Sequence, residues 1–415
     1  MHSHSGLQAC RGSSKVAVLD TVHGAGIIAQ RMVESGLKAQ AFEVYHCTPC
    51  LDGFDLVVSP VHLGPENPAL AQARSLGKRI ITHHQAVGEL VHPGLSVFEV
   101  TGTHSKTSTA LLLAKILSDE KRVVSHTTRG IELWSKGSSC QVQAGLSITP
   151  GNVIHAIEAA KGNQADVLVC EVSLGGTGLA DFGILTSFAG DYRIAQGTTW
   201  ASTAKLQMVS LAKEKAHLVA NVDVRISPDV SFGATGRVRV APDKLYFGKD
   251  AFDLELDQDL DFPGYETAIS AAAAACNVAG VGKTEVVAAL EGFDGFVGRM
   301  KIIREGTLEI YDSSNSGLKV SDVSRALDRI RGRRLGLVVG EESETVCEGM
   351  DVPRLVNLLK LRRDEIDLLV LVGGRMAPWA VNLKARTAPN LAAGVNQAKA
   401  VGGIDRLLSC VKCFR

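Results

Sequence analysis

Short runs of almost continuous apolar residues recur along the chain, and helical patterns separate them. Strands that read as unbroken apolar runs are buried on both faces, as in a parallel sheet with helices packed on either side. The pattern therefore predicts an α/β protein built on parallel sheets. The clearest runs are KVAVL (15–19), DLVVS (55–59), VFEV (97–100), RVVSH (122–126), DVLVCEVS (166–173), LGLVVG (335–340) and DLLVLV (367–372).

The length of 415 residues exceeds that of one ordinary domain. His92-Pro93-Gly94 interrupts the pattern, since proline and glycine punctuate regular structure. A new series of strands begins near residue 301. We therefore expect three α/β domains, spanning residues 1–93, 94–300 and 301–415.

Charge and composition argue against several classes of partner. Lys and Arg number 44 and Asp and Glu number 44, so no bulk field attracts nucleic acid or an anionic membrane. Aromatic residues make up 5% of the chain, which disfavours a surface for stacking bases. Neither a signal peptide nor an apolar run of transmembrane length is evident. These features predict a cytoplasmic protein, monomeric or homodimeric, without nucleic-acid or membrane partners.

The segment VTGTHSKTS, residues 100–108, follows a predicted strand and precedes a predicted helix. Lys106 would begin that helix, where free N–H groups and the helix dipole attract phosphate. Thr107 would offer a hydroxyl to Mg²⁺. A strict G-x-x-x-x-G-K-[ST] phosphate loop has a glycine directly before the lysine, where this chain has Ser105. Serine is tolerable there if it avoids a positive φ, and is otherwise strained.

Glu171 ends the run VLVCE beside the glycine-rich turn SLGGTG. Ligands of open parallel sheets bind at the carboxyl ends of the strands. A carboxylate there, next to a phosphate loop, is a natural ligand of Mg²⁺. A helix cap or a surface residue is the alternative.

Two cysteine pairs have the spacing of metal ligands, Cys47/Cys50 and Cys410/Cys413. Together they would form a four-thiolate site if the two chain ends met in space. The alternative is reduced thiols, near a loop and in a frayed tail.

An ordered series of motifs resembles the Mur ligase family. The motifs are VTGTHSKTS, CEVS, GILTSFAGDY, STAKLQM, ANVDV, GRMK and YDSSNSG, within about residues 15–375. The resemblance implies a three-domain architecture with a central P-loop-type parallel sheet. It also implies an ATP-dependent ligase that joins a carboxylate to a nucleophile through an acyl phosphate.

The same resemblance implies roles for individual residues. Thr101 to Ser108 form the phosphate loop, which comprises Thr101, Gly102, Thr103, His104, Ser105, Lys106, Thr107 and Ser108. Mg²⁺ would be bound by Thr107, Glu171, Asp191 and Lys205, the last of which matches a lysine that is often carbamoylated. Arg299 would reach the γ-phosphate, and Asp312 would contact the ribose of ATP. Lys106, Glu171, Lys205 and Arg299 are the expected catalytic residues.

Two positions depart from the family pattern. Tyr192 replaces a metal-binding histidine, and Tyr265-Glu266 replaces the His-Asn pair that contacts adenine. The N-terminal segment also lacks an obvious uridine-nucleotide signature. The departures indicate a specialised branch with another substrate.

The branch that the chain most resembles completes coenzyme F-430, the nickel tetrapyrrole of methanogens. TVHGAG, VSPVHLGPENP, THHQAVGEL and DSSNSGLKVSDV suggest that branch. The resemblance implies ATP and Mg²⁺ as cofactors, with nickel present only in the tetrapyrrole substrate. His104, His126, Glu132 and Tyr192 are candidates for the base, and Thr82, His83, His84, His62 and Arg129 for substrate binding.

Three other functions stay open from the sequence. A Mur-type amide ligase would need a free amine as a second substrate. A non-catalytic nucleotide-binding protein would bind ATP without turnover. A dinucleotide-dependent oxidoreductase would use Gly24 and Gly26, but the full G-x-G-x-x-G pattern is absent.

Overall fold

The computed structural model describes residues 7, 14–330, 334–342 and 349–414. Internal contacts divide the chain into two compact units. The first unit comprises Met1–Leu254 and Glu266–Leu290, and the second comprises Glu255–Tyr265 and Glu291–Arg415. The first unit contains two large sheets and the second contains one.

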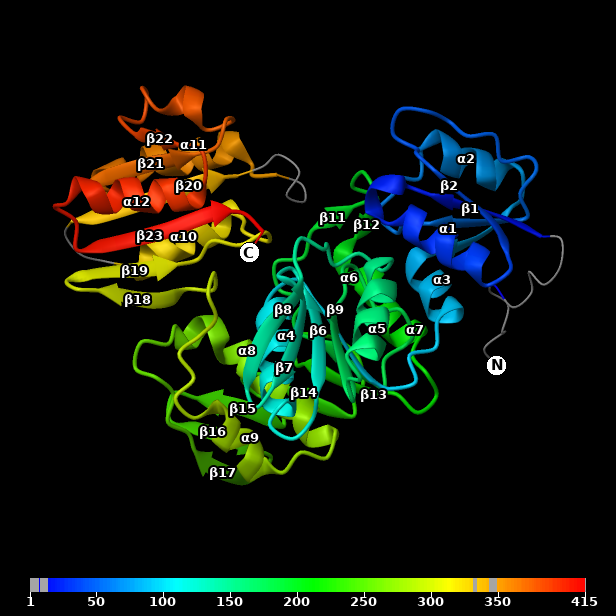
Figure 1. The fold of residues 1–415 in the computed structure, drawn as a ribbon, viewed down its shortest axis with the longest axis horizontal. Coiled ribbons are helices and arrows are strands. Elements are labelled where there is room, and N and C mark those ends of the chain that lie inside the picture. Colours follow the sequence, from blue (N-terminus) through cyan, green and yellow to red (C-terminus); the bar gives the residue numbers. More distant parts are fainter. Residues whose placement is uncertain (1–6, 8–13, 331–333, 343–348, 415) are drawn as a thin grey trace. The chain divides into compact units, whose positions relative to one another are not determined.

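A four-stranded parallel sheet forms the N-terminal part of the first unit (Figure 1). Its elements are β1 (Lys15–Leu19), η2 (Thr21–His23), α1 (Ala25–Glu34), β2 (Lys38–Phe42), β3 (Leu56–Ser59), α2 (Pro68–Ser75), β4 (Arg79–Thr82) and α3 (His83–Leu90). The strand order is β2-β1-β3-β4. Val16 and Val18 of β1 pack with α1 and α3, whereas Ala17 and Leu19 pack with α2. The side chains of a strand alternate in direction, so β1 contributes to two hydrophobic cores, one on each face of the sheet.

The second sheet of the first unit has eleven strands. Its strands are β5 (Ser96–Thr101), β6 (Val123–Thr127), β7 (Gly130–Ser135), β8 (Ser138–Gln143), β9 (Val167–Glu171), β10 (Phe182–Leu185), β13 (His217–Asn221), β14 (Val230–Phe232), β15 (Val238–Ala241), β16 (Lys244–Phe247) and β17 (Asp250–Asp253). The order is β17-β16-β15-β14-β13-β10-β5-β9-β6-β7-β8. The strands from β15 to β6 in that order are parallel, and antiparallel strands extend both edges.

Strand β5 lies at the point where the strand order reverses. The chain passes from β5 to β6 on one side and later returns to β10 on the other, with β9 beside β5. Such a switch point is where open α/β sheets bind ligands, beyond the carboxyl ends of the strands. The loop after β5 and the end of β9 therefore occupy the favoured place for a site.

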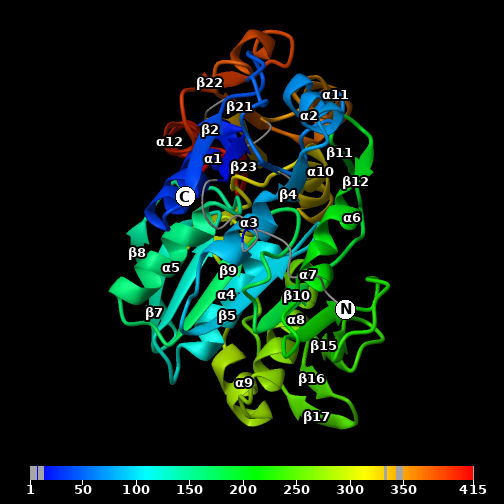
Figure 2. The same ribbon diagram turned by 90° about the vertical axis from the view of Figure 1, so that its right-hand side faces the viewer.

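Helices cover this sheet, together with a short two-stranded ribbon. The elements are α4 (Lys106–Leu117), α5 (Asn152–Gly162), β11 (Arg193–Ile194), β12 (Thr199–Trp200), α6 (Ala201–Lys205), α7 (Gln207–Ser210), α8 (Phe262–Val278) and α9 (Lys283–Leu290). Helix α4 packs on β5, β6 and β9, and its side chains are buried except at Lys106 and Lys115. Figure 2 shows α4 beside β5 and β9. In the alanine-rich α8, Ala271 to Ala275 are fully buried. Within the part of the chain that the structure describes, none of the helices combines the length and hydropathy needed to span a bilayer.

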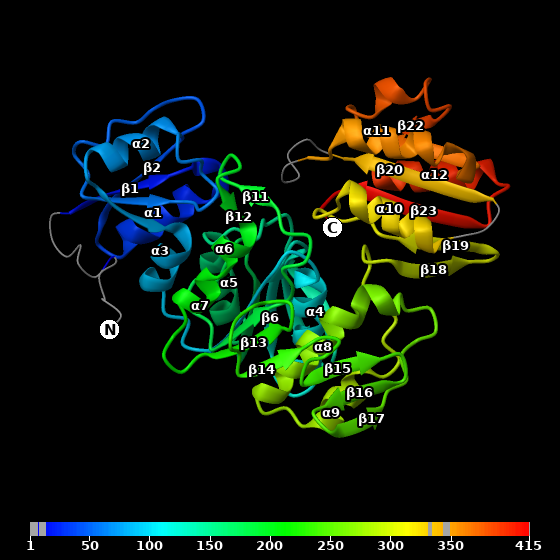
Figure 3. The same cartoon turned by 180° about the vertical axis from the view of Figure 1, so that it is seen from behind.

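The second unit is built on a six-stranded sheet (Figure 3). Its elements are β18 (Lys301–Glu305), β19 (Leu308–Asp312), α10 (Val320–Arg329), β20 (Leu335–Glu341), α11 (Val352–Leu361), η3 (Arg363–Glu365), β21 (Leu368–Val372), η4 (Ala377–Trp379), β22 (Arg386–Ala388), α12 (Leu391–Val401) and β23 (Arg406–Lys412). The order is β18-β19-β23-β20-β21-β22, parallel except at β18. Helices α10 and α11 pack on one face and α12 on the other. The predicted α/β fold with parallel sheets is confirmed, while the boundaries of three domains stay a prediction.

Candidate active site

The predicted phosphate loop lies at the switch point of the eleven-stranded sheet. Thr101 ends β5, and Lys106 begins α4. Glu171 ends β9, which pairs in parallel with β5. Two segments that are 64 residues apart in sequence, around Thr107 and Glu171, therefore meet at one edge of the sheet.

Ser105 has a positive φ, which is the strained one of its two possible conformations. Its φ is 60° and its ψ is 3°, in the left-handed region. For a residue with a Cβ this costs on the order of 1–3 kcal/mol, and such strain concentrates at functional sites. The strained residue directly precedes Lys106, so it sets the direction in which α4 starts.

The loop is fastened to the segment that follows β10. The backbone N–H of Thr103 donates to Ser187 O at 2.8 Å, and its hydroxyl lies 2.7 Å from Ala189 O and 3.0 Å from Ser187 O. The Thr186 hydroxyl donates to His104 O at 2.6 Å. The hydroxyl hydrogen of Thr103 is therefore used within the protein, and the loop is held by the segment that follows β10.

Gly102 fits a position that no larger residue could take. Its φ is 151°, and a Cβ there would collide with the Thr186 hydroxyl. The neighbouring Thr101 hydroxyl is buried and has no hydrogen-bond partner among the described residues. An unsatisfied buried hydroxyl at the base of the loop is a group that a ligand or water could satisfy.

Lys106, Thr107 and Glu171 form a compact group. The Thr107 hydroxyl donates to Glu171 Oε2 at 2.7 Å, and Lys106 Nζ lies 4.0 Å from Glu171 Oε1. Glu171 is 2% exposed. The Thr128 N–H also points to Glu171 Oε2, at 3.4 Å. A hydroxyl and a buried carboxylate offer the hard oxygen ligands that Mg²⁺ prefers, and the lysine offers a cation for phosphate.

The start of α4 has no side-chain cap. Ser105 stands at the N-cap and makes no capping hydrogen bond through its side chain. The first N–H groups of a helix lack partners within the helix, and they carry the positive end of its dipole. This twelve-residue helix therefore presents an anion-binding end beside Lys106, while Ser108 is already buried in its first turn.

Asp191, Tyr192 and Lys205 form a second group near α6. Asp191 Oδ1 accepts the N–H of Tyr192 at 2.9 Å and that of Ser202 at 3.0 Å. Lys205 is 1% exposed, and its Nζ lies 5.7 Å from the centre of the Tyr192 ring. The Tyr192 ring is thus a neighbour of the buried Lys205. Asp191 holds the start of α6 through the N–H of Ser202.

Arg299 and Asp312 belong to the second unit. Asp312 is 3% exposed, and it accepts the N–H of Gly298 at 3.0 Å and the Ser409 hydroxyl at 2.9 Å. The Ser314 N–H lies 3.2 Å from the same carboxylate. Asp312 therefore holds the turn that carries Arg299.

Tyr265 and Glu266 lie near the start of the alanine-rich helix α8, and their side chains differ in burial. The Tyr265 hydroxyl accepts the Phe296 N–H at 2.7 Å, and its ring packs on Phe293 at a centroid distance of 5.2 Å. Burial raises the pKa of Tyr265 above its usual range. Tyr265 is thus a packing residue, whereas the Glu266 side chain is half-buried.

The four candidate bases differ in accessibility. His126 is fully buried, and burial lowers its pKa to about 4. Glu132 is 2% exposed, burial raises its pKa, and Arg129 pairs with it at 2.8 Å. His104 and Tyr192 are half-buried. The last two side chains are therefore the more accessible of the four.

His83 and His84, two of the candidates for substrate binding, lie in the interior of the protein and not at its surface. Both are nearly fully buried, and burial lowers their pKa values to about 3 and about 4. His83 Nε2 bonds to Leu19 O at 2.9 Å and His84 Nε2 to Ser173 O at 2.7 Å. Neutral at physiological pH, they tie backbone segments of the first unit together. Thr82, by contrast, lines a pocket.

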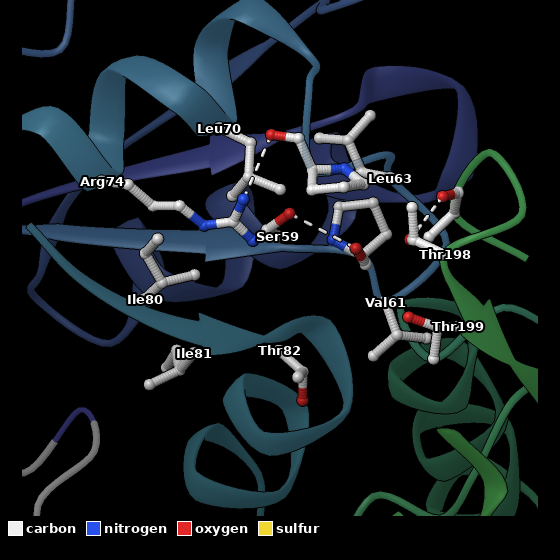
Figure 4. Close-up of a pocket in the computed structure, with 13 residues that line it drawn as sticks. Ser59, Val61, Leu63, Leu70, Arg74, Ile80, Ile81, Thr82, Thr198 and Thr199 are labelled. Carbon is white, nitrogen blue, oxygen red and sulfur yellow. Dashed lines mark hydrogen bonds between the residues drawn. The ribbon is translucent and has the colours of Figure 1, made fainter. Parts of the chain in front are cut away.

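That pocket lies beyond the ends of β3 and β4 (Figure 4). Its lining combines apolar side chains with the hydroxyls of Ser59, Thr82, Thr198 and Thr199, and Arg74 is its charged group. Arg74 Nη1 donates to Pro65 O at 3.1 Å. None of the residues around Lys106 lines it. The lining therefore offers a ligand one cation, several hydroxyl groups and apolar side chains.

The alternative of reduced thiols near a loop and in a frayed tail is confirmed for the loop and wrong for the tail. Cys47 and Cys50 lie in the loop between β2 and β3, whereas Cys410 belongs to the last strand. Cys47 and Cys50 are exposed, whereas Cys410 is buried in β23 and Cys413 is buried just after it. Among the described residues, no group of three or more potential metal ligands includes a cysteine.

Sequence reasoning missed a group in the N-terminal sheet. Asp20 lies within hydrogen-bonding distance of His23, His62 and Tyr45. Of these, only His62 is among the predicted substrate-binding residues. The signal was the polar sequence DTVH directly after the apolar run KVAVL.

Comparison with known proteins gives a full-length relative. The coenzyme F(430) synthetase of Methanosarcina acetivorans is 34% identical over 468 residues, covering 97% of this chain and 99% of the relative. A family model described as coenzyme F430 synthetase CfbE, C-terminal domain, matches residues 302–413. A UDP-N-acetylmuramate–L-alanine ligase of Pediococcus pentosaceus is 30% identical over 99 residues, which cover 23% of this chain and 22% of that protein.

Solved structures share the fold. A pseudomurein peptide ligase type C from Methanothermus fervidus aligns with a TM-score of 0.52 at 15% identity, over 96% of each chain. A bifunctional folylpolyglutamate synthase/dihydrofolate synthase from Yersinia pestis aligns with a TM-score of 0.55 at 16% identity, over 80% of this chain and 92% of that one. At these identities the likeness concerns the fold alone.

Proposed function

The chain belongs to the coenzyme F430 synthetase family, and we propose that it closes the last ring of a nickel tetrapyrrole by ATP-dependent activation of a propionate. The observation that carries the proposal is the 34% identity to a coenzyme F(430) synthetase over 97% of the chain. The enzyme is an ATP-dependent ligase with the fold of the Mur ligases. Its specific substrate and its acyl phosphate are the proposed part.

A propionate needs activation because its charge is delocalised and oxide is a very poor leaving group. In the proposed reaction a carboxylate oxygen attacks the γ-phosphorus of ATP and ADP departs. A carbon of the same molecule then attacks the acyl carbon, its proton passes to a base, and phosphate leaves. The sum is ADP, phosphate and a six-membered carbocycle that contains a ketone. The substrate loses one water overall.

We assign the phosphates of ATP to Lys106 and the backbone N–H groups in the first turn of α4. The uncapped helix end and the cation 4.0 Å from Glu171 support this assignment. Transfer of a phosphoryl group relies on positioning and on balancing negative charge. The loop around Thr103 supplies the positioning, since its hydrogen bonds to Ser187 and Ala189 are made within the protein.

Thr107 and Glu171 are the proposed Mg²⁺ ligands. Their oxygen atoms are 2.7 Å apart and buried, so both fit a hard cation. When bound, Mg²⁺ would neutralise charge on the transferred phosphoryl group. Asp191 and Lys205 would contribute to a second Mg²⁺, with Lys205 carbamoylated and with Tyr192 in the place of a histidine ligand.

In the second unit, Arg299 is the proposed contact of the γ-phosphate and Asp312 that of the ribose. Asp312 already accepts hydrogen bonds from Gly298, Ser409 and Ser314. Its main action would therefore be to hold the Arg299 turn. The three-domain organisation, split at residues 93 and 300, is part of the same proposal.

The tethered nucleophile distinguishes the proposal from amide formation. An intramolecular carbon needs no amine pocket, and covalent tethering gives a large proximity advantage. His104 and Tyr192 remain the accessible candidates for the base. The pocket with Arg74 is the proposed region for part of the macrocycle, since one cation and several hydroxyl groups beside apolar side chains suit a carboxylate-bearing ring.

The test is incubation with ATP, Mg²⁺ and the ring-open nickel precursor without any amine. The proposal predicts ADP, phosphate and a product lighter than the precursor by one water, followed by mass. A turnover that requires a free amine would instead identify an amide ligase. ATP binding without any turnover would identify a non-catalytic nucleotide-binding protein.

A further inference from the structure

Potential metal ligands meet beyond the ends of two neighbouring strands, β1 and β3. Asp20 directly follows β1, His23 ends η2, and His62 follows β3. His23 Nδ1 lies 2.7 Å and His62 Nε2 lies 3.2 Å from Asp20 Oδ2. All three ligand atoms lie within 4.8 Å of one another.

The carboxylate is held rigidly. Asp20 is fully buried and has a φ of 77°, a left-handed conformation for a residue with a Cβ. The N–H groups of Val22 and His23 donate to Oδ1 at 3.1 and 3.2 Å. The Tyr45 hydroxyl donates to Oδ2 at 2.8 Å. The left-handed conformation of Asp20 is a strained one, and strained residues of this kind cluster at functional sites.

The two imidazoles are open to ligands. The His23 side chain is 39% exposed and that of His62 is 28% exposed. Their rings meet edge to face at a centroid distance of 4.4 Å. One buried carboxylate oxygen and two accessible imidazole nitrogens form part of a coordination shell. A bound metal ion would complete the shell with water or another ligand.

The chemistry of the donors differs from that of the Mg²⁺ group. Thr107 and Glu171 offer oxygen alone, which suits Mg²⁺. Two imidazoles with one carboxylate suit borderline divalent ions such as Zn²⁺ and Ni²⁺. Three protein ligands also leave a coordination position open.

We propose that Asp20, His23 and His62 bind a divalent transition-metal centre through one carboxylate oxygen and imidazole nitrogens. Two sources supply such a centre. A hydrated ion would be coordinated by all three side chains. A metal already held in a tetrapyrrole has only its axial positions left, and it would be coordinated by one imidazole. The second source rests on the proposed function, whereas the first does not.

The test uses the untagged full chain in which His2 and His4 are replaced by glutamine, because these histidines could also bind metal. After treatment with a chelator, NiCl₂ and ZnCl₂ are titrated by calorimetry. In a second arm, a nickel(II) tetrapyrrole carboxylate is titrated and its absorption spectrum is recorded. The variants are H23Q, H62Q and D20N. H155Q is the matched control, because His155 is a half-exposed histidine beside Glu158.

In the ion arm we expect one equivalent of metal, with affinity weakened about tenfold or more in each cluster variant. In the tetrapyrrole arm we expect this loss in the variant of the one histidine that binds the metal. H155Q should bind as the parent does in both arms. A cluster-dependent response in the ion arm identifies an ion site, and one in the tetrapyrrole arm identifies substrate recognition. If neither arm responds, or if the cluster variants bind as the parent does, the proposal is overturned. Circular dichroism selects the variants that fold, and D20N keeps the shape of the carboxylate. ATP turnover on the same samples separates this outcome from failure of the proposed function.

Discussion

At the scale of single residues, the contact between Thr107 and Glu171 does most to define the site. Residues 64 positions apart lie 2.7 Å from each other, with Lys106 beside them. Each of the three has an ordinary alternative when considered alone in the sequence. Their meeting at one edge of a parallel sheet favours the phosphate and metal interpretation.

Lys106→Ala should lower the rate of ADP formation by about 100-fold or more, because removal of one preorganised group that stabilises developing charge costs this much. The measurement is a coupled ADP assay. Lys115→Ala is the matched control, since Lys115 lies on the same helix and is not fully buried. Equal activity of both variants would remove Lys106 from the reaction.

Glu171→Gln should raise the Mg²⁺ concentration that gives half-maximal activity. An amide is a weaker ligand for Mg²⁺ than a carboxylate of the same shape. The Mg²⁺ dependence of ADP formation, recorded at saturating ATP, measures the effect. An unchanged Mg²⁺ dependence with a lowered rate would assign Glu171 to another task.

Ser105→Gly should raise the free energy of unfolding by about 1 kcal/mol, since glycine adopts the left-handed conformation of Ser105 without strain. Equilibrium denaturation in urea measures the change. Ser118→Gly is the control, because Ser118 has a negative φ of −78°. A clear loss of stability in S105G would mean that the serine side chain makes a contribution larger than its strain.

At the scale of elements, strand β5 leads into the predicted phosphate loop and also contains a buried carboxylic acid, Glu99. Glu99 in β5 is fully buried and accepts the Thr177 N–H at 2.9 Å. Burial raises its pKa from the usual 4.5 to about 7. The folded protein therefore binds this proton more tightly than the unfolded chain does, and Glu99 favours folding less as pH rises from about 4.5 to 7.

Glu99→Gln should abolish this part of the pH dependence. At pH 8 the variant should be more stable by up to about 3.5 kcal/mol, at about 1.4 kcal/mol for each pKa unit. At pH 4 the two proteins should differ little, because Glu99 is then protonated in both states. Unfolding free energies at the two pH values test this. A variant that is less stable at pH 8 would show that the Glu99 carboxylate is stabilising.

The elements could be predicted from the sequence where their pattern was local. The runs around Val16, Val124 and Leu168 became buried parallel strands, and the alanine-rich run became α8. Long-range partners could not be predicted, because the fastening of Thr103 to Ala189 depends on how the strands order in the sheet. The buried state of His83 and His84 likewise comes from packing of α3, which polar sequence alone does not reveal.

At the scale of the whole molecule, the candidate residues are shared between two compact units. Lys106, Thr107, Glu171, Asp191 and Lys205 belong to the first, and Arg299 and Asp312 to the second. A ligand that binds the folded protein stabilises it by mass action, by about 2.7 kcal/mol at 100 times its dissociation constant.

ATP with Mg²⁺ should therefore raise the unfolding temperature, and the shift should be smaller in Arg299→Ala if Arg299 contacts the γ-phosphate. Thermal unfolding with and without the nucleotide measures both. Arg325→Ala is the control, since Arg325 is an exposed residue of the same unit that pairs with Asp322. The same shift in R299A as in the parent would exclude Arg299 from nucleotide binding.

The central claim is that ATP activates a carboxylate of the substrate as an acyl phosphate. The most direct measurement uses ring-open nickel precursor whose reacting carboxylate carries ¹⁸O at both oxygens, with mass analysis of the released phosphate. The account predicts one ¹⁸O in each phosphate and the other in the ring ketone, because the oxygen that attacks phosphorus leaves with it. Release of unlabelled phosphate alongside ring closure would contradict it.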